Sequence, residues 1–404
     1  MRGLSSRIGA IGMLAGGVTL LTASPVMAVP DCPSVPKSKV LLTGQGRLES
    51  IIGDARGRLY FTDLSDNRLL RLDGPGQQPR VLATDMKRPG GLVWEPGGAL
   101  VAGFSGGAAS GVPGNGMAGL FRVNPETGAK RAFVTGIDQA NGLARGRDGS
   151  LYTSNDISNE IVRVRPNGSV ERHWADVESA NGLVIDTTAR YLFVAQTFTP
   201  AKIARLPLAN PGNATTWFSA PPEDTAAGLD GLTRDGADRL YAAANGGGEV
   251  WRVTSGNRAC ALARDLSLPS SVAFGGGGSF DRRNLYVVTF SGSVIELARA
   301  TDRPASTPPG SPGGQKPAKR PKLNLSVHPR VTRAEKRTRF EFTVTSRGRA
   351  VAGAKVRLGG DTATTGKHGR AHISRRFDRP GTVHASVSRA GYRAGTVAIT
   401  VRED

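Results

Sequence analysis

Six small or polar residues recur at a regular spacing along the first three quarters of the chain. Each stands just ahead of a short apolar run, at intervals of 41, 51, 40, 49 and 40 residues. We call them the start residues: Glu49, Gly90, Asn141, Asn181, Asp230 and Ser270. Four of them carry a carboxylate or amide oxygen. If a repeating fold brings equivalent positions to one point, these oxygens would repel one another unless a cation sat between them.

The chemistry of these four side chains favours a hard divalent metal. Glu49, Asn141, Asn181 and Asp230 would supply oxygen ligands with two formal charges, which suits Ca²⁺ best, although Mg²⁺ or Mn²⁺ could replace it. No Cys or His stands at these positions to form a zinc site. Asn-Gly and Asp-Gly are also common turn pairs, which leaves a turn interpretation open for three of the four. Glu49 is not a turn former, and its place in register favours the metal.

The repeats that carry the start residues predict the fold. Most units continue as a Gly-containing turn and an apolar strand, as in "NGLARGRDGSLYTSND" from Asn141. A period of about 40 to 50 residues is typical of four-stranded propeller blades, and no unit contains the amphipathic helix of a helical solenoid. We therefore expect a six-bladed β-propeller over residues 29–300. Rotation about its axis would bring the start residues together at the mouth of the central channel.

The remainder of the chain predicts a second, smaller domain. Residues 301–322 are rich in Pro, Gly and Lys, which is typical of an extended linker. Residues 323–404 alternate apolar and polar residues between Gly turns, which predicts a small β-sandwich. Its stretch "VAGAKVRLGG" and the segments after it resemble bacterial immunoglobulin-like or carboxypeptidase-regulatory-like domains. The predicted fold class is thus all-β, with a six-bladed β-propeller followed by a small β-sandwich.

The N-terminus has the pattern of a signal peptide. Arg2 and Arg7 precede an apolar run over residues 8–21, and Val26-Met27-Ala28 offers a small-residue cleavage site. A membrane anchor is the alternative, but the run is short for a bilayer and is interrupted by glycines. We expect residues 1–28 to be removed, which leaves a secreted or cell-envelope-associated protein without a transmembrane segment.

Two cysteines, Cys32 and Cys260, are the only ones in the chain. Export would place both in an oxidising compartment, where a single disulfide is reasonable, while two free buried thiols are the alternative. Cys32 precedes the first repeat and Cys260 precedes the last. A bridge between them would tie the ends of the propeller together.

Positive charge gathers in the last quarter of the chain. The formal net charge is +20, and the residues from Asp302 onward hold 22 Lys and Arg against 7 Asp and Glu. A basic domain on an exported protein suggests contact with anionic polymers of the cell envelope, although the charge could serve solubility alone. We do not expect nucleic acid as a partner, because the sequence shows neither a helical motif that could read DNA bases nor a group of aromatic residues on which bases could stack.

Residues 45–300 resemble the SMP-30/gluconolactonase/LRE family of six-bladed propellers. The resemblance rests on Glu49 of "LESII", Asn141 of "ANGLA", Asn181 of "ANGLV" and Asp230 of "LDGLT", which follow the order of that family's metal ligands. It implies a metal-dependent hydrolase of lactone or ester substrates, in which Asp230 is the general base as well as a ligand. Gln139 stands where sugar-lactonase members have an Arg, which leaves sugar specificity open.

Polar residues at other repeat positions are candidates for substrate contact. Besides Gln139, they lie at the ends of strands and could also be turn formers: Asn155, Asp156, Gln196 and Asn245. Two other functions remain open. One is a non-catalytic ligand-binding propeller with a structural metal. The other is a condensation chemistry like that of strictosidine synthase, for which Glu49 is the only candidate catalytic Glu among the start residues.

Overall fold

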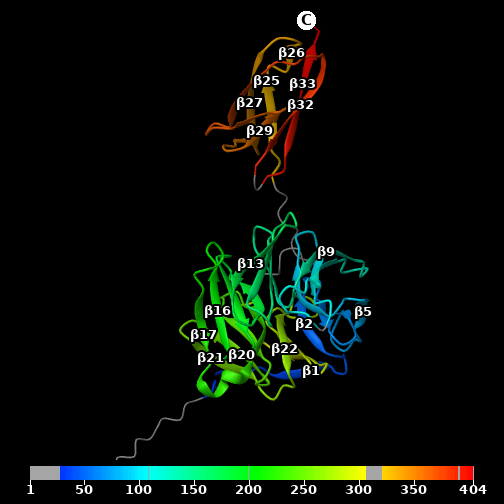
Figure 1. The fold of residues 1–404 in the computed structure, drawn as a ribbon, viewed down its shortest axis with the longest axis vertical. Helices are drawn as coiled ribbons and strands as arrows, with labels where there is room; N and C mark the ends of the chain where they lie inside the picture. The colour runs from blue at the N-terminus through cyan, green and yellow to red at the C-terminus, as the bar shows by residue number, and fades with distance from the viewer. Residues whose placement is uncertain (1–27, 108, 199, 306–320, 390–391, 404) are drawn as a thin grey trace, which may run out of the picture. The chain divides into compact units, whose positions relative to one another are not determined.

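The structure is a computed structural model that describes residues 28–404, apart from 108, 199, 306–320, 390–391 and 404. The chain divides into two compact units, Met1–Gly314 and Gln315–Asp404. Figure 1 shows both units. All but the last residue of the predicted signal peptide lies outside the described residues, as does most of the predicted linker.

The first unit contains six four-stranded antiparallel sheets, which confirms the predicted propeller. Each of the first five blades is built from consecutive strands. Blade 1 contains β2 (Leu48–Gly53), β3 (Leu59–Asp63), β4 (Arg68–Leu72) and β5 (Arg80–Ala83). Blade 2 contains β6 (Pro89–Trp94), β7 (Leu100–Phe104), β8 (Ala118–Val123) and β9 (Lys130–Ile137). Blade 3 contains β10 (Leu143–Arg145), β11 (Leu151–Ser154), β12 (Glu160–Val164) and β13 (Val170–Asp176).

The second half of the ring repeats this order. Blade 4 contains β14 (Ala180–Ile185), β15 (Tyr191–Gln196), β16 (Lys202–Pro207) and β17 (Thr215–Ser219). Blade 5 follows a 3₁₀ helix, η1 (Pro222–Ala227), and contains β18 (Leu229–Arg234), β19 (Leu240–Ala244), β20 (Glu249–Thr254) and β21 (Arg258–Ala263). Blade 6 contains β22 (Pro269–Phe274), β23 (Leu285–Thr289), β24 (Val294–Leu297) and β1 (Ser38–Leu42).

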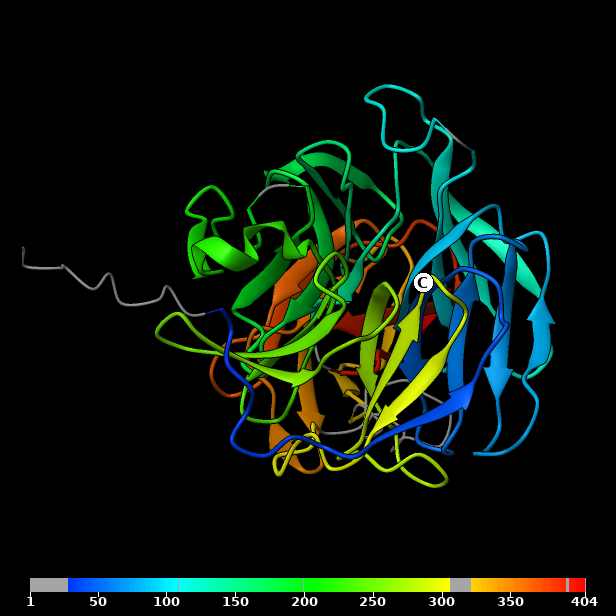
Figure 2. The same ribbon diagram turned by 90° about the horizontal axis from the view of Figure 1, so that it is seen from below.

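The N-terminal segment closes the ring. Strand β1 pairs antiparallel with β24 and completes blade 6, as the blue segment beside the yellow strands in Figure 2 shows. Just before β1, Cys32 forms a disulfide with Cys260 of β21, the outer strand of blade 5. The predicted bridge is therefore present in the structure. The hydrogen bonds of β1 close blade 6, while the disulfide pins the preceding segment to the neighbouring blade.

The blades are held against one another by buried strands and by aromatic side chains between them. The second strands β3, β7, β11, β19 and β23 are buried at every residue, because neighbouring blades cover both of their faces. Aromatic side chains fill the space between blades. Trp94 of blade 2 packs edge-on against Tyr60 of blade 1 and donates a hydrogen bond to the Gly53 carbonyl at 2.9 Å. Such contacts fix the rotation of each blade relative to the next.

The second unit has two sheets packed around one apolar core, which confirms the predicted β-sandwich. One sheet contains β25 (Asn324–His328), β27 (Thr338–Ser346), β28 (Arg349–Ala350) and β31 (Arg370–Arg375). The five-stranded sheet has the order β26 (Val331–Arg333), β33 (Gly395–Arg402), β32 (Gly381–Ser388), β29 (Lys355–Leu358) and β30 (Asp361–Thr364).

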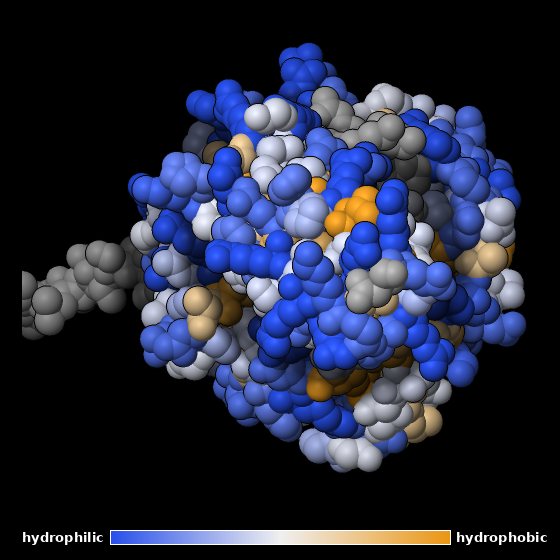
Figure 3. All heavy atoms as spheres, turned by 90° about the horizontal axis from the view of Figure 1, so that it is seen from above, coloured by the Kyte–Doolittle hydropathy of each residue, from blue (hydrophilic) through white to orange (hydrophobic). Residues whose placement is uncertain are grey.

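The surface of the molecule is mostly hydrophilic on the face seen in Figure 3, and apolar residues form only small patches there. Across the described ranges, we find no helix with the length and apolar character that crossing a membrane requires.

Candidate active site

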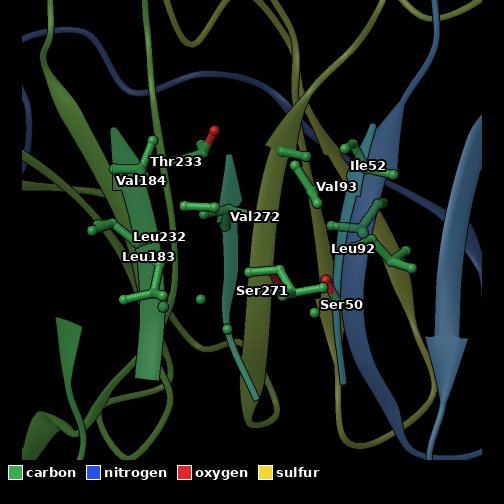
Figure 4. A pocket seen from close by; sticks show the side chains of 18 of the residues that line it. Ser50, Ile52, Leu92, Val93, Leu183, Val184, Leu232, Thr233, Ser271 and Val272 are labelled. Carbon is green, nitrogen blue, oxygen red and sulfur yellow. The ribbon is translucent and has the colours of Figure 1, made fainter. Parts of the chain in front are cut away.

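The predicted metal ligands lie together in the floor of a cleft at one end of the propeller axis. The cleft has a volume of about 460 Å³, and its lining includes Glu49, Asn141, Asn181 and Asp230. The same four residues bound one end of the central channel, a cavity of about 310 Å³. Figure 4 shows side chains of the inner strands, such as Leu92, Val184 and Val272, along this channel. The four residues thus separate an open cleft from a mostly aliphatic channel.

A bulge at the beginning of the inner strands aims these side chains at the axis. Glu49, Asn181 and Asp230 are each the second residue of the inner strand of their blade, and Asn141 lies two residues before β10 begins at Leu143. The register of β2, β14 and β18 with their neighbours shifts just after these residues. An extra residue at this point bends the strand and turns a side chain out of the ordinary alternation. Equivalent bends in successive blades therefore direct equivalent side chains to one place.

The glycines after the start residues allow the blades to approach each other. A Cβ at Gly142 would lie 2.2 Å from the Asn181 carbonyl oxygen, and one at Gly182 would lie 2.3 Å from the Asp230 carbonyl oxygen. These distances are shorter than a side chain tolerates. Asn181-Gly182 and Asp230-Gly231 thus lie inside inner strands, where the turn interpretation does not apply, and Asn141-Gly142 leads into one.

The carboxylates at the cleft floor are buried close to one another. Glu49 and Asp230 are only 9% and 4% exposed. Burial, followed by repulsion from Asp156, raises the pKa of Glu49 well above its usual range, although Arg47 and Arg88 oppose the shift. Burial and repulsion from Glu49 raise the pKa of Asp230 in the same way. The charged form of both groups is therefore disfavoured in the protein alone.

Neighbouring polar groups orient the floor residues. Asn181 donates from Nδ2 to the Thr197 hydroxyl at 3.0 Å, and that hydroxyl donates to the Leu229 carbonyl at 2.7 Å. Because the amide nitrogen is engaged, the orientation of the Asn181 side chain is set. Asn245 donates to the Pro269 carbonyl at 3.0 Å and lies 3.5 Å from Oδ2 of Asp230. These contacts hold the ligand candidates in position without neutralising their charge.

The donor set fits a hard divalent cation. Among the described residues there is no group of three or more His, Cys, Asp or Glu that could hold a metal. The predicted set is of a different kind, with two carboxylates and two amides. Neither Glu49 nor Asp230 belongs to an ion pair in the described part of the chain. Oδ1 of Asp156, a third carboxylate lining the cleft, is buried without a hydrogen-bond partner. A cation would relieve both the repulsion and the unsatisfied oxygen.

The predicted substrate-contacting residues divide into two groups. Gln139, Asp156 and Asn245 line the cleft, and Oε1 of Gln139 accepts a hydrogen bond from the Asp156 amide at 2.8 Å. The described lining does not include Asn155 or Gln196.

Strand alternation explains the difference. Asn155 donates to the Gly111 carbonyl at 3.0 Å and accepts the Ile157 amide at 3.1 Å, and Gln196 donates to the Glu178 carbonyl at 2.8 Å. Successive side chains point to opposite faces, so the next residue along the chain faces the cleft in each case. These residues are Asp156 and Thr197. Of the two residues predicted after β11, Asp156 lines the cleft and Asn155 does not, and the prediction for Gln196 was one position out of register.

One wall of the cleft comes from the long connection between β7 and β8. Ser105, Gly107 and Ser110 of this connection line the cleft. Both carboxylate oxygens of Asp138 accept backbone amides from it, at 2.9 Å from Gly114 and 3.0 Å from Gly116. The connection is tied to the body of blade 2 rather than hanging free over the site.

Sequence reasoning missed the arginines of the cleft. Arg47 and Arg88 line it, and each lies two residues before a start residue. Gln139 holds the same position in blade 3, and Leu268 holds it in blade 6. The repeat alignment therefore contained the signal, because this position lines the cleft in four of the six blades.

Comparison with known proteins agrees with this geometry. A family model, the SMP-30/Gluconolactonase/LRE-like region, matches residues 49–291. No curated protein sequence matches significantly.

Solved structures share the propeller. A gluconolactonase from Xanthomonas campestris is 18% identical, with a TM-score of 0.54 over 67% of this chain and 97% of that chain. A calcium-binding protein, regucalcin, from Agrobacterium tumefaciens is 17% identical, with a TM-score of 0.53 over 67% of this chain and 97% of that chain. A luciferin-regenerating enzyme is 14% identical, with a TM-score of 0.54 over 69% and 100% of the respective chains. At these identities the likeness establishes the fold. Since the family model spans more than half of the chain, including all four predicted ligands, the protein belongs to the SMP-30/gluconolactonase/LRE-like family.

Proposed function

We propose that the protein is an exported hydrolase of lactone or ester substrates that depends on a divalent metal, with Ca²⁺ as the best fit. The observation that carries the proposal is the convergence of Glu49, Asn141, Asn181 and Asp230, from four different blades, on one cleft floor. Membership of the family supports the reaction class. The similar folds of a gluconolactonase and of a calcium-binding regucalcin are consistent with it.

The floor residues have distinct roles in the proposed reaction. Glu49, Asn141, Asn181 and Asp230 would hold the cation, which when bound would polarise the substrate carbonyl and stabilise the developing oxyanion. Asp230 would accept the proton of the attacking water. The water oxygen bonds to the acyl carbon, the acyl carbon–oxygen bond breaks, and the leaving alkoxide takes the proton. The two asparagines exchange no proton and act only by position, while Asn245 orients Asp230 from the side.

The test combines metal binding with turnover on the full chain. Calcium chloride is titrated calorimetrically into protein stripped with EDTA, and the same preparations are screened against lactones and carboxylic esters with and without Ca²⁺. Saturable binding and Ca²⁺-dependent hydrolysis are the expected results. Ca²⁺ binding without any turnover would favour the second candidate, a ligand-binding propeller with a structural metal. Hydrolysis that is unchanged by EDTA would overturn the metal-dependent mechanism.

Two features near the N-terminus support export. The Cys32–Cys260 disulfide is of the kind that persists in oxidising compartments. The backbone nitrogen of Val29 donates to Asp224 at 2.6 Å, and Arg264 donates to the Val29 carbonyl at 2.6 Å. Cleavage after Ala28 would create an ammonium group at the nitrogen that faces Asp224, and that charge would strengthen the contact. N-terminal sequencing of secreted protein should begin at Val29, and a mature chain that begins well beyond Cys32 would contradict the proposal.

We further propose that the C-terminal unit contacts an anionic cell-envelope polymer through the outward face of its five-stranded sheet. Lys355 and Arg357 are exposed on β29 and pair with Ser388 and Ser386 of β32. Arg402 is exposed on β33. In the described part of the chain, none of these three cations belongs to an ion pair. On the other sheet, Glu341 pairs with Arg370 and His372, while the exposed Arg339 and Arg349 belong to no ion pair among the described residues.

Binding to purified cell walls across a salt series tests this proposal. The full chain should sediment with the walls at low salt and be released as salt rises, since screening weakens exposed charge contacts. Two triple variants are compared. The first replaces three cations of the proposed face, Lys355→Ser, Arg357→Ser and Arg402→Ser. It should weaken retention more than the control variant of the other sheet, with Arg339→Ser, Arg347→Ser and Arg349→Ser. Equal effects of the two triple variants, or retention insensitive to salt, would contradict the assignment of this face.

A further inference from the structure

Two arginines at the cleft rim have no acidic partner, although acidic side chains lie just below them. Arg47 and Arg88 line the cleft and are exposed, and the described residues contain no ion pair that involves either. The Arg47 guanidinium lies 4.1 Å from the centre of the Phe290 ring, which orients it over the rim. Two cations at the mouth of a cleft are a ready site for an anion.

The backbone around Arg88 is held in an unusual conformation. Lys87 and Arg88 have φ values of 53° and 57°, in the left-handed region that side chains other than glycine rarely adopt. The Arg88 amide donates to Oδ1 of Asn67 at 2.6 Å, and the Lys87 carbonyl accepts the Ser105 and Gly106 amides at 3.1 and 3.0 Å. The position of Arg88 at the rim is thus set by the fold and not by a loose surface loop.

Two large apolar side chains are also exposed at the rim. Phe198 and Ile157 line the cleft and are 69% and 55% exposed, which is high for residues of their size. Phe198 belongs to blade 4, which stands opposite blade 1 in a ring of six, and blade 1 carries Arg47. Large apolar side chains left open at a cleft mark a contact for an apolar group. Phe198 thus stands across the ring from Arg47, while Ile157 belongs to blade 3, next to the blade that carries Arg88.

The formal charges of the residues that line the cleft indicate the charge of the ligand that would balance them. Its lining holds two cations, Arg47 and Arg88, and three carboxylates, Glu49, Asp156 and Asp230. With a divalent metal in the floor, the formal sum is one positive charge. A ligand with one negative charge would balance the site, while a neutral ligand would leave a guanidinium without a partner. This step rests on the metal-dependent function proposed above.

We propose that the substrate is an amphipathic, anionic ester or lactone. Its carboxylate or phosphate pairs with Arg47 and Arg88, whose planar forks suit such oxyanions. Its apolar chain or ring lies against Phe198 and Ile157, and its acyl carbon then lies over the floor between them. Arg47 and Arg88 determine specificity and take no part in proton transfer.

The experiment compares three small ligands on the full chain. Sodium octanoate, octanamide and sodium acetate are titrated calorimetrically with Ca²⁺ present and again with EDTA. Octanoate is expected to bind about tenfold or more tightly than either octanamide, which lacks the charge, or acetate, which lacks the chain. Arg47→Gln with Arg88→Gln should lower octanoate affinity about tenfold and leave octanamide unchanged. Phe198→Ser should weaken octanoate and not acetate.

Matched variants separate the possible outcomes. Arg80→Gln with Arg131→Gln removes the same charge from exposed outer strands of blades 1 and 2 and should leave octanoate binding unchanged. Equal affinity for octanoate and octanamide, or an equal loss in this control, would overturn the inference while Ca²⁺-dependent hydrolysis still stood. Octanoate binding that depends on Arg47 and Arg88 in a protein that neither binds Ca²⁺ nor hydrolyses esters would support the anion site and refute the proposed hydrolase. Thermal unfolding of each variant verifies that the fold is retained.

Discussion

The mouth of the propeller and the outward face of the C-terminal five-stranded sheet use regular strand positions in opposite ways. In the propeller, equivalent residues of successive blades are related by rotation, so Glu49 and Asp230 meet in one buried floor. In the sheet, Lys355 and Arg357 stand two residues apart on β29, about 6.6 Å along the strand, so they remain separate and exposed on one face. A repeated polar residue becomes one site in the first case and a series of independent contacts in the second.

The largest effect should come from a single change at the converged site. Asp230→Asn removes one of two charged ligands while keeping size and an oxygen, and we expect Ca²⁺ affinity to fall about 100-fold or more because ligand charge count dominates affinity. Calorimetric titration measures it. Asp176→Asn, on the outer strand of blade 3, is the matched control and should bind like the wild type. Unchanged Ca²⁺ binding in Asp230→Asn would show that the cleft floor is not a single converged site and does not differ from the sheet in this respect.

The disulfide that ties the N-terminal segment to blade 5 belongs to the propeller alone, so its removal should affect only that unit. The double variant Cys32→Ser with Cys260→Ser removes a bridge between residues that are 228 positions apart in the sequence. We expect the propeller to lose about 2–5 kcal/mol of unfolding free energy, while the C-terminal unit keeps its stability. Hydrogen exchange measured strand by strand gives the two values separately. Equal losses of protection in both units would mean that they do not unfold independently.

The third prediction compares glycines in the two units. Gly182→Ala would place a Cβ 2.3 Å from the Asp230 carbonyl oxygen, whereas nothing lies within 4 Å of a Cβ at Gly366. We expect Gly182→Ala to cost about 1–3 kcal/mol, since overpacking forces the backbone to shift. Gly366→Ala should change stability by less than about 0.5 kcal/mol. Chemical denaturation checks both, and a harmless Gly182→Ala would show that blade contacts at the inner strands are looser than the structure indicates.

The smallest effect should be that of one cation on the sheet. Arg357→Ser removes one contact among several, and we expect affinity for an anionic wall polymer to fall only about two- to fivefold, the range of a single exposed ion pair. Cell-wall binding at a fixed salt concentration measures it against Arg349→Ser on the opposite sheet. Loss of all binding from this one change would show that the face contains a converged site after all.

Much of the propeller could be predicted from periodicity. The start residues recur at intervals typical of a blade-sized unit, and the structure places five of them second in an inner strand and Asn141 two residues before one. Ligand candidates could be chosen because their register, chemistry and family resemblance agreed. The disulfide partners could be paired because the chain has only two cysteines.

Register at strand ends was harder to predict. Asn155, Asp156 and Gln196 were all expected in the cleft, but only Asp156 of the three lines it, and Thr197 lines it in place of Gln196. A shift of one residue reverses the direction of a side chain, and bulges change the count by one. Sequence spacing cannot resolve a single residue where bulges are common, so the identity of the cleft-facing residue had to come from the fold.

The sequence by itself determined the repeat, the positions that could carry ligands, and the separation of charge between the two units. These properties are local, because they depend on residue type and spacing along the chain. The tertiary structure decided the burial of Glu49 and Asp230, the unsatisfied oxygen of Asp156, and the grouping of Arg47 and Arg88 at one side of the rim. Those properties depend on which residues from distant blades share one space, and only closing the ring brings them together.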